Sequence, residues 1–148
     1  MSRKLDPQVR SLRSVSLFGQ RRQNYHLYRA LARAGATFLA IPSAFTRPTG
    51  MAHWHTLLRS RAIESQAYVF AAAQGGVHEN GRETFGHSLV VSPWGEILCE
   101  GGVQPAVMFA DIDLQLLADV RRRVPSLQHD RPFEVVTAAR PVRSKVPS

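Results

Sequence analysis

Apolar residues change their spacing several times along the chain, and each change predicts a different secondary-structure element. The first pattern has the three- and four-residue spacing of a helix face, at Leu27, Tyr28, Leu31 and Ala34. Gly35 follows as a stop signal, and residues 37–41 then form a short, nearly continuous apolar run. Such a run is typical of a strand covered on both faces. A helix followed by a buried strand is therefore predicted.

The alternation of elements continues as far as Pro125. A second helix face consists of Met51, Trp54, Leu57, Leu58 and Ala62, with Thr49 as its predicted N-cap. Further strands are predicted at residues 67–73, 86–91, 96–100 and 107–112, and residues 75–81 are expected to be a polar loop. Asp113 is the predicted cap of a last helix that ends before Pro125. This order favours an α/β fold with two apolar-faced sheets.

Residues 1–24 differ in composition from the rest of the chain. Of the net charge of +8, residues 1–22 carry +5, from six basic residues against Asp6. The excess sits on a basic arm, in which Val15 and its serine neighbours predict a short strand, and does not form a stripe across a folded face. Nucleic acid is therefore not an expected partner. We expect three parts: the arm at 1–24, a domain at 25–132 and a tail at 133–148.

Composition restricts the class and compartment of the protein. The chain has 148 residues, 44% of them hydrophobic, which suits a single globular domain. No apolar run approaches a membrane span and no signal-peptide core is present, so we expect a cytoplasmic protein with no membrane partner. The single cysteine excludes an internal disulfide.

Spacing alone reveals no reactive or metal-binding group. Cys99 falls within a predicted strand without a neighbouring His to activate it, so we interpret it as a small buried residue. His53 and His55 would point to nearly opposite sides of a helix, and no second Cys/His cluster completes a coordination sphere. We therefore predict no metal site.

Two other groups have a functional and a structural interpretation. Arg61 and Glu64 can pair along the helix surface, either as a solvated pair or as an ion pair buried at an interface, and the sequence favours neither. Ser43, Phe45 and Thr46 follow a buried strand, at the end where α/β proteins tend to place their sites.

Several motifs together resemble the nitrilase (carbon–nitrogen hydrolase) superfamily, in the branch that holds deaminated-glutathione amidase and omega-amidase. They occur in the segments AGATFLAIPSAFTRPTGMAHWHTLLRSRAIESQAYVFAAAQ and GRETFGHSLVVSPWGEIL. The shared pieces are His53-Trp54, Leu57-Leu58-Arg59, Arg61-Ala62-Ile63-Glu64, Gln66, Gly86-His87-Ser88 and Pro93-Trp94-Gly95, with VPSLQHDRP near the C-terminus. The resemblance runs from about Leu27 to Pro132 and is specific as a combination.

The resemblance implies the C-terminal half of an α-β-β-α sandwich of two sheets that dimerises through its helices. The implied interface comprises Leu27, Leu31, Trp54, Leu58, Arg61 and Glu64, and the implied acyl pocket comprises Ser43, Phe45, Thr46 and Trp54. It also implies hydrolysis of a small amide without metal or cofactor. In such chemistry a Cys attacks, a Glu moves protons and a Lys stabilises the developing oxyanion.

The chain departs from this family pattern where the chemistry should lie. No segment corresponds to the one that holds the family's Glu and Lys, and the position of the nucleophilic Cys falls on Gly19. His55 stands where the branch usually has Glu. We therefore assign no catalytic residue.

Three interpretations remain open. The first is a partial amidase domain, inactive as a lone chain and prone to associate because its apolar faces and strand edges lack cover. The second is an amidase completed by a separate chain that supplies Glu, Lys and Cys. The third is a non-catalytic interaction module whose basic arm binds an acidic partner.

Overall fold

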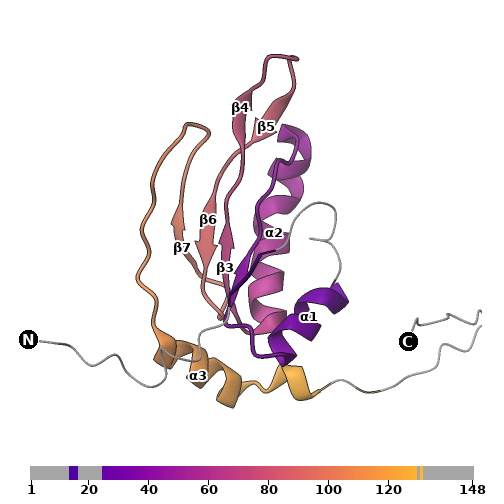
Figure 1. Cartoon of the computed structure of the whole chain (residues 1–148), viewed down its shortest axis with the longest axis vertical. Helices are drawn as coiled ribbons and strands as arrows, with labels where there is room; N and C mark the ends of the chain where they lie inside the picture. Colours follow the sequence, from indigo (N-terminus) through magenta and orange to yellow (C-terminus); the bar gives the residue numbers. More distant parts are fainter. Residues whose placement is uncertain (1–13, 17–24, 130, 132–148) are drawn as a thin grey trace, which may run out of the picture.

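The computed structural model describes residues 14–16, 25–129 and 131 (Figure 1). Most of the predicted basic arm and all of the predicted tail therefore lie outside the described residues. Within the arm, Ser14–Ser16 form strand β1, as the pattern around Val15 predicted, and β1 pairs with β2 (Phe38–Ala40) in parallel. This piece of the arm region is thus part of the sheet.

One sheet has the strand order β1-β2-β3-β6-β7, with β3 at Tyr68–Ala71, β6 at Leu89–Val91 and β7 at Ile97–Glu100. Strands β1, β2 and β3 are parallel, whereas β6 and β7 run antiparallel to their neighbours. Parallel strands need a crossover. Helix α2, Arg47–Ser65, provides it between β2 and β3. The predicted α/β class is confirmed.

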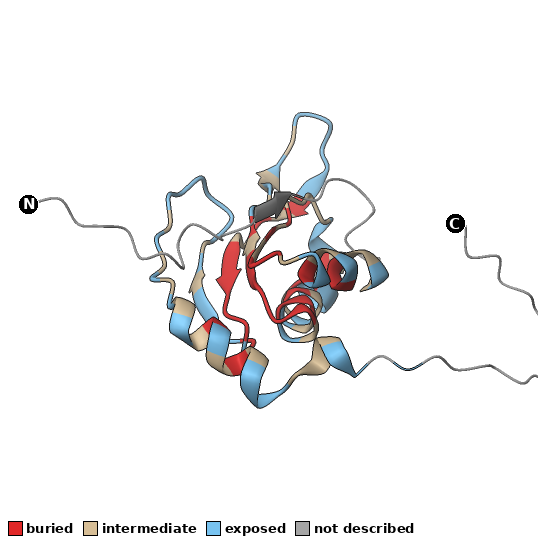
Figure 2. Cartoon of the chain, turned by 60° about the horizontal axis from the view of Figure 1, so that its bottom comes forward, coloured by how far each residue is buried: buried red, intermediate tan, exposed pale blue. Residues whose placement is uncertain are grey.

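The core lies between this sheet and the helices. Trp54, Leu58 and Ala62 of α2 are buried in one cluster with residues of the sheet such as Leu39 and Val69. Helix α1, Tyr25–Arg33, adds Tyr28 to the same cluster. Figure 2 shows the buried residues gathered between the helices and the strands. The helical spacing seen in the sequence marks the centre of both inward faces, but Met51 is 67% exposed, and Ala34 lies exposed after the end of α1.

Some predicted elements are wrong or displaced. Residues 107–112 form no strand, because the apolar run finds no partner strand, and Phe109 is 88% exposed. Residues 75–81 are not simply a loop, since Gly75–Val77 (β4) pairs with Glu83–Phe85 (β5) in a two-stranded ribbon. The N-cap of α2 is Thr46 and not Thr49, and a proline occupies its first turn.

The predicted C-terminal helix is confirmed. Asp113 is the N-cap of α3 (Leu114–Arg123), and its Oδ1 accepts a hydrogen bond from the Gln115 amide at 2.8 Å. A short 3-10 helix, η3 (Ser126–Gln128), follows. In the described part of the chain, no helix is both long and apolar enough to cross a membrane.

Polar side chains dock α3 against the C-terminal end of α2. Gln66 is the C-cap of α2 at φ 48°, and its Nε2 donates to the carbonyls of Val120 and Val124. Arg121 donates from Nε to the Gln66 carbonyl at 3.1 Å and from Nη2 to the Ala36 carbonyl at 2.9 Å. Burial lowers the pKa of Arg121. These hydrogen bonds join the C-terminal end of α2 to the C-terminal part of α3.

A second arginine fastens η3 in the same region. Arg29 of α1 is 7% exposed, and it donates to the Glu64 carbonyl at 3.1 Å and to the Ser126 carbonyl at 2.8 Å. Buried guanidinium groups need several acceptors, and main-chain carbonyls supply them here. We call Arg29, Gln66 and Arg121 the polar anchor.

Candidate functional site

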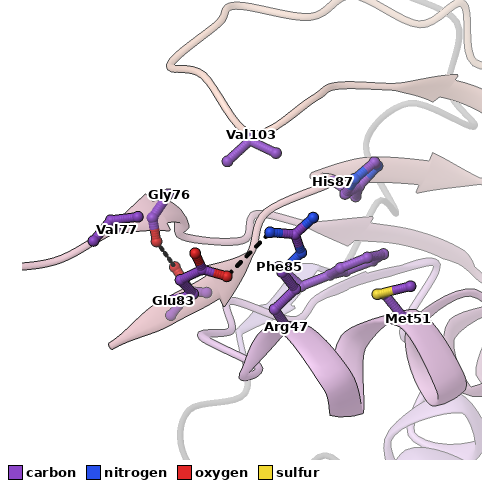
Figure 3. Close-up of a pocket in the computed structure, with 9 residues that line it drawn as sticks. Arg47, Met51, Gly76, Val77, Glu83, Phe85, His87 and Val103 are labelled. Atoms are coloured by element: carbon purple, nitrogen blue, oxygen red, sulfur yellow. Dashed lines mark hydrogen bonds and ion pairs between the residues drawn. The ribbon is translucent and has the colours of Figure 1, made fainter. Parts of the chain in front are cut away.

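A pocket of about 330 Å³ lies at the other end of α2, between its first turns and the β4–β5 ribbon (Figure 3). Arg47 and Met51 line it from α2, Phe85 and His87 from β5 and the segment after it, and Val103 from the loop after β7. At its outer side Arg47 Nη1 lies 3.1 Å from Glu83 Oε2. The two side chains are 62% and 46% exposed, so this ion pair orders the rim without contributing much stability.

Helix α2 approaches the side chain of Phe85, which lines the pocket, very closely at Gly50. A Cβ at Gly50 of α2 would lie 2.2 Å from Phe85 Cβ, so only glycine fits there without a shift of the ribbon. Gly86 then turns the chain at φ +69°, where a Cβ would lie 2.9 Å from the Gly102 carbonyl oxygen. Gly50 thus lets the ribbon lie against the helix, and Gly86 turns the chain from the ribbon toward β6.

Beside the pocket, two histidines converge on one carboxylate. His55 Nε2 of α2 lies 2.9 Å from Glu100 Oε1 of β7, and His87 Nδ1 lies 2.7 Å from the same oxygen. Partial burial by itself raises the pKa of Glu100, but the hydrogen bonds from His55 and His87 outweigh it, so the pKa lies below its usual value. We call His55, His87 and Glu100 the histidine–glutamate cluster.

The backbone of His87 is held on both sides. Its amide donates to the Gly102 carbonyl at 3.0 Å, and its carbonyl accepts a hydrogen bond from Trp54 Nε1 at 2.7 Å. Its ring stacks on the Phe85 ring with centroids 4.3 Å apart. His87 has φ +56°, a left-handed conformation that is uncommon outside glycine. The surrounding contacts therefore fix both the position and the direction of this imidazole.

Comparison with known proteins places this geometry in a family. Residues 21–122 match the family model described as Carbon-nitrogen hydrolase. The chain belongs to this family. It is 52% identical over 103 residues to the deaminated glutathione amidase of Homo sapiens and 48% identical over 103 residues to that of Synechocystis. The predicted resemblance to the nitrilase superfamily is thereby confirmed.

These carbon–nitrogen hydrolases are longer than the matched segment. The alignments cover 70% of this chain but only 32% of the human and 38% of the cyanobacterial protein. Among solved structures, Saccharomyces cerevisiae Nit3, a member of branch 10 of the nitrilase superfamily, superposes with a TM-score of 0.75 at 33% identity. That match covers 81% of this chain and 44% of Nit3. The fold is therefore a nitrilase-superfamily fold, of which this chain spans less than half.

Four residues were predicted to line an acyl pocket: Ser43, Phe45, Thr46 and Trp54. None of them lines the pocket of Figure 3. Ser43 bridges to Ala73 beside the sheet, and Thr46 is the exposed cap of α2. Trp54 is 1% exposed, and its ring lies 5.3 Å from that of half-buried Phe45. A role of these four residues in substrate binding stays a prediction, and the structure adds that Trp54 holds His87.

The six residues predicted to form a dimer interface fall into three pairs. Trp54 and Leu58 are buried within this chain, whereas Leu27 and Leu31 are half-buried at the edge of the core. Arg61 and Glu64 do pair, with 2.6 Å between Nη1 and Oε2, and the Arg61 guanidinium also lies over the Tyr28 ring. The pair is thus partly buried within this chain, with side-chain exposures of 11% and 39%, and its burial at an interface stays a prediction. Dimerisation itself stays a prediction.

One expectation about a reactive side chain needs revision. Cys99 is half-buried on β7, and not buried as expected. The absence of a metal site stays a prediction: it rested on the spacing of His53 and His55 and on the lack of a second Cys/His cluster in the sequence, and His53 is exposed and outside the cluster. The argument did not consider His87 and Glu100, because the cluster unites residues up to 45 positions apart. The sequence offered one signal for this cluster, namely that His55 stands where the family branch usually has Glu.

Proposed function

We propose that residues 25–132 form part of a carbon–nitrogen hydrolase domain that does not hydrolyse amides by itself. In this proposal the Glu, Lys and Cys expected of the family come from a separate chain, and without it the protein is inactive. With it, the substrate is a small carboxylic amide, as the similarity to deaminated glutathione amidases suggests.

The composition of the matched segment carries this proposal. Residues 21–122 contain no lysine, since the only lysines of the chain are Lys4 and Lys145. A mechanism that needs an ammonium group to meet an oxyanion therefore has no candidate in this segment. The only thiol, Cys99, sits on β7, which is the last strand of its sheet. Its neighbour Glu100 is already engaged by two histidines.

An open sheet face supports the need for a partner. The face of the main sheet turned away from the core lines a shallow pocket of about 340 Å³, which includes Ala40, Phe70 and Val90. Next to it, Val107 and Phe109 are 83% and 88% exposed. Exposed apolar surface of this kind is typical of an association site. A complementing chain or a second copy of this one would cover it.

The test is an ammonia-release assay on a panel of small aliphatic carboxamides. We expect no ammonia from this chain alone, and release after co-expression with a chain that carries the Glu, Lys and Cys segments expected of the family. The matched control is the same second chain with its Cys changed to Ala, which should be silent. Ammonia release by this chain alone, abolished by Cys99→Ser, would refute the proposal. If co-expression gives no activity, complementation is rejected and only the inactive partial domain is retained.

A further inference from the structure

The histidine–glutamate cluster brings together three atoms that are all potential metal ligands. They are His55 Nε2, His87 Nδ1 and one carboxylate oxygen of Glu100, and they lie within 4.8 Å of one another. Each comes from a different element: α2, the segment before β6, and β7. A ligand set spread over three elements is held by the tertiary fold, so its spacing does not depend on a single flexible segment.

The distances suit a small dication. In a tetrahedral zinc site with bonds of about 2.0–2.2 Å, ligand atoms lie about 3.3 Å apart. Two pairs in the cluster lie at 2.9 and 2.7 Å, joined through hydrogen bonds. An ion would replace the shared protons and separate these pairs by about half an ångström, which rotations of the three side chains can supply.

The contacts that hold His87 in place indicate that the histidine–glutamate cluster is more than a pair of surface hydrogen bonds. His87 is kept in a left-handed conformation by the Gly102 and Trp54 contacts, and such strain persists where the surroundings over-determine it. The side chains of His55, His87 and Glu100 are 35%, 32% and 32% exposed, so solvent reaches the cluster. Three protein ligands with an accessible fourth position are the arrangement of zinc sites that also bind a water molecule or a substrate.

We propose that His55, His87 and Glu100 form a binding site for a divalent transition-metal ion, with Zn²⁺ the ion that best matches two imidazoles and one carboxylate. Imidazole also suits nickel and copper, whereas magnesium and calcium prefer oxygen ligands. The ion would fasten α2 to β7 beside the pocket of Figure 3, which His87 also lines. The site goes beyond the proposed amidase function and does not rest on it.

The test is calorimetric titration of Zn²⁺ into the tag-free, metal-stripped chain. We expect one equivalent to bind, and His55→Gln and Glu100→Gln each to lower the affinity at least tenfold. His53→Gln is the matched control, because His53 lies on the same helix, exposed and outside the cluster. It should bind as the unchanged chain does. Circular dichroism of each variant checks that the fold is retained.

A second readout identifies the ligand atoms. Addition of Zn²⁺ should shift the NMR signals of His55 Nε2 and His87 Nδ1 and leave those of His53 unchanged. The proposal is overturned if no stoichiometric Zn²⁺ binding occurs, or if binding survives both His55→Gln and Glu100→Gln. It is also overturned if His53→Gln weakens binding as much as the other two, since the ion would then be held elsewhere.

Discussion

The two ends of helix α2 use polar side chains in opposite ways. At the C-terminal end, the polar anchor donates to main-chain carbonyls, among them those of Gln66, Ala36 and Ser126. Nearer the N-terminal end, the side chains of the histidine–glutamate cluster interact with one another, and both imidazoles approach a single carboxylate oxygen. At the C-terminal end the polar side chains are bonded to main-chain carbonyls, whereas the side chains of the histidine–glutamate cluster are accessible to solvent. We call the C-terminal end of α2 the closed end.

This difference separates hydrogen bonds that hold secondary-structure elements together from those that a ligand can replace. A main-chain carbonyl cannot leave its place without distortion of an element, so bonds to it fasten α3 and η3 and are costly to break. Bonds between side chains that are a third exposed can open by rotation, and a ligand can replace them. The anchor should therefore respond to substitution through stability, and the cluster through ligand affinity.

The largest expected effect is on the anchor. Arg121→Ala leaves the carbonyls of Gln66 and Ala36 without their donor, and we expect a loss of about 2–3 kcal/mol in the free energy of unfolding. Urea denaturation measures it. The matched control is Arg122→Ala on the next residue, which breaks only the ion pair between the 73%-exposed Arg122 side chain and Asp119 and should cost less than about 0.5 kcal/mol. Equal losses in both variants would contradict the comparison.

The next effect tests the close contact between Gly50 of α2 and the side chain of Phe85. Gly50→Ala places a methyl group against Phe85, and we expect a net loss of about 1–2 kcal/mol although alanine favours the helix by up to about 1 kcal/mol. In a Phe85→Gly background the same change should be neutral or stabilising, since Phe85 Cβ and the ring that it would meet are both gone. A stabilising Gly50→Ala in the unchanged chain would show that the ribbon shifts freely.

The sequence predicted what depends on local periodicity. Helix α2 and strands β2 and β3 were found, because their buried faces recur at fixed spacing and their packing partners lie nearby in the chain. The β4–β5 ribbon was missed, because its short polar strands show no apolar pattern and rely on contact with α2 at Gly50. Residues 107–112 were over-predicted, because an apolar run has no register without a neighbouring strand.

The candidate site was predictable only in part. The motifs around Trp54 and Gly86-His87-Ser88 identified the family, as the comparison confirms. The cluster was not found, since His55, His87 and Glu100 come together only after α2 packs beside β6 and β7. Helix geometry correctly separates His53 from His55, but it says nothing about residues on other elements.

A smaller effect tests whether the backbone of His87 positions its ring. Trp54→Phe removes the indole N–H that donates to the His87 carbonyl at 2.7 Å, and keeps an aromatic ring in the core. If His55, His87 and Glu100 hold Zn²⁺, we expect roughly tenfold weaker binding, as for other residues that support metal ligands. Calorimetry measures it, with Arg121→Ala as the control that perturbs the other end of α2. Weaker binding in Arg121→Ala but not in Trp54→Phe would refute this role of Trp54.

The smallest effect lies at the closed end and depends on pH. Tyr68 donates its hydroxyl to the Asp113 carbonyl at 2.7 Å, and burial raises the pKa of its phenol above the ordinary value of 10.0. A raised pKa means that folding favours the neutral phenol, so its contribution is complete below pH 10 and is lost as the pH rises further. At neutral pH, Tyr68→Phe should cost about 1 kcal/mol for the lost hydrogen bond. Urea denaturation of both chains from pH 7 upward should show this difference shrinking above pH 10, because only the chain with Tyr68 loses stability there. A constant difference to the highest pH at which both chains fold would mean that the phenol titrates alike in the folded and unfolded states.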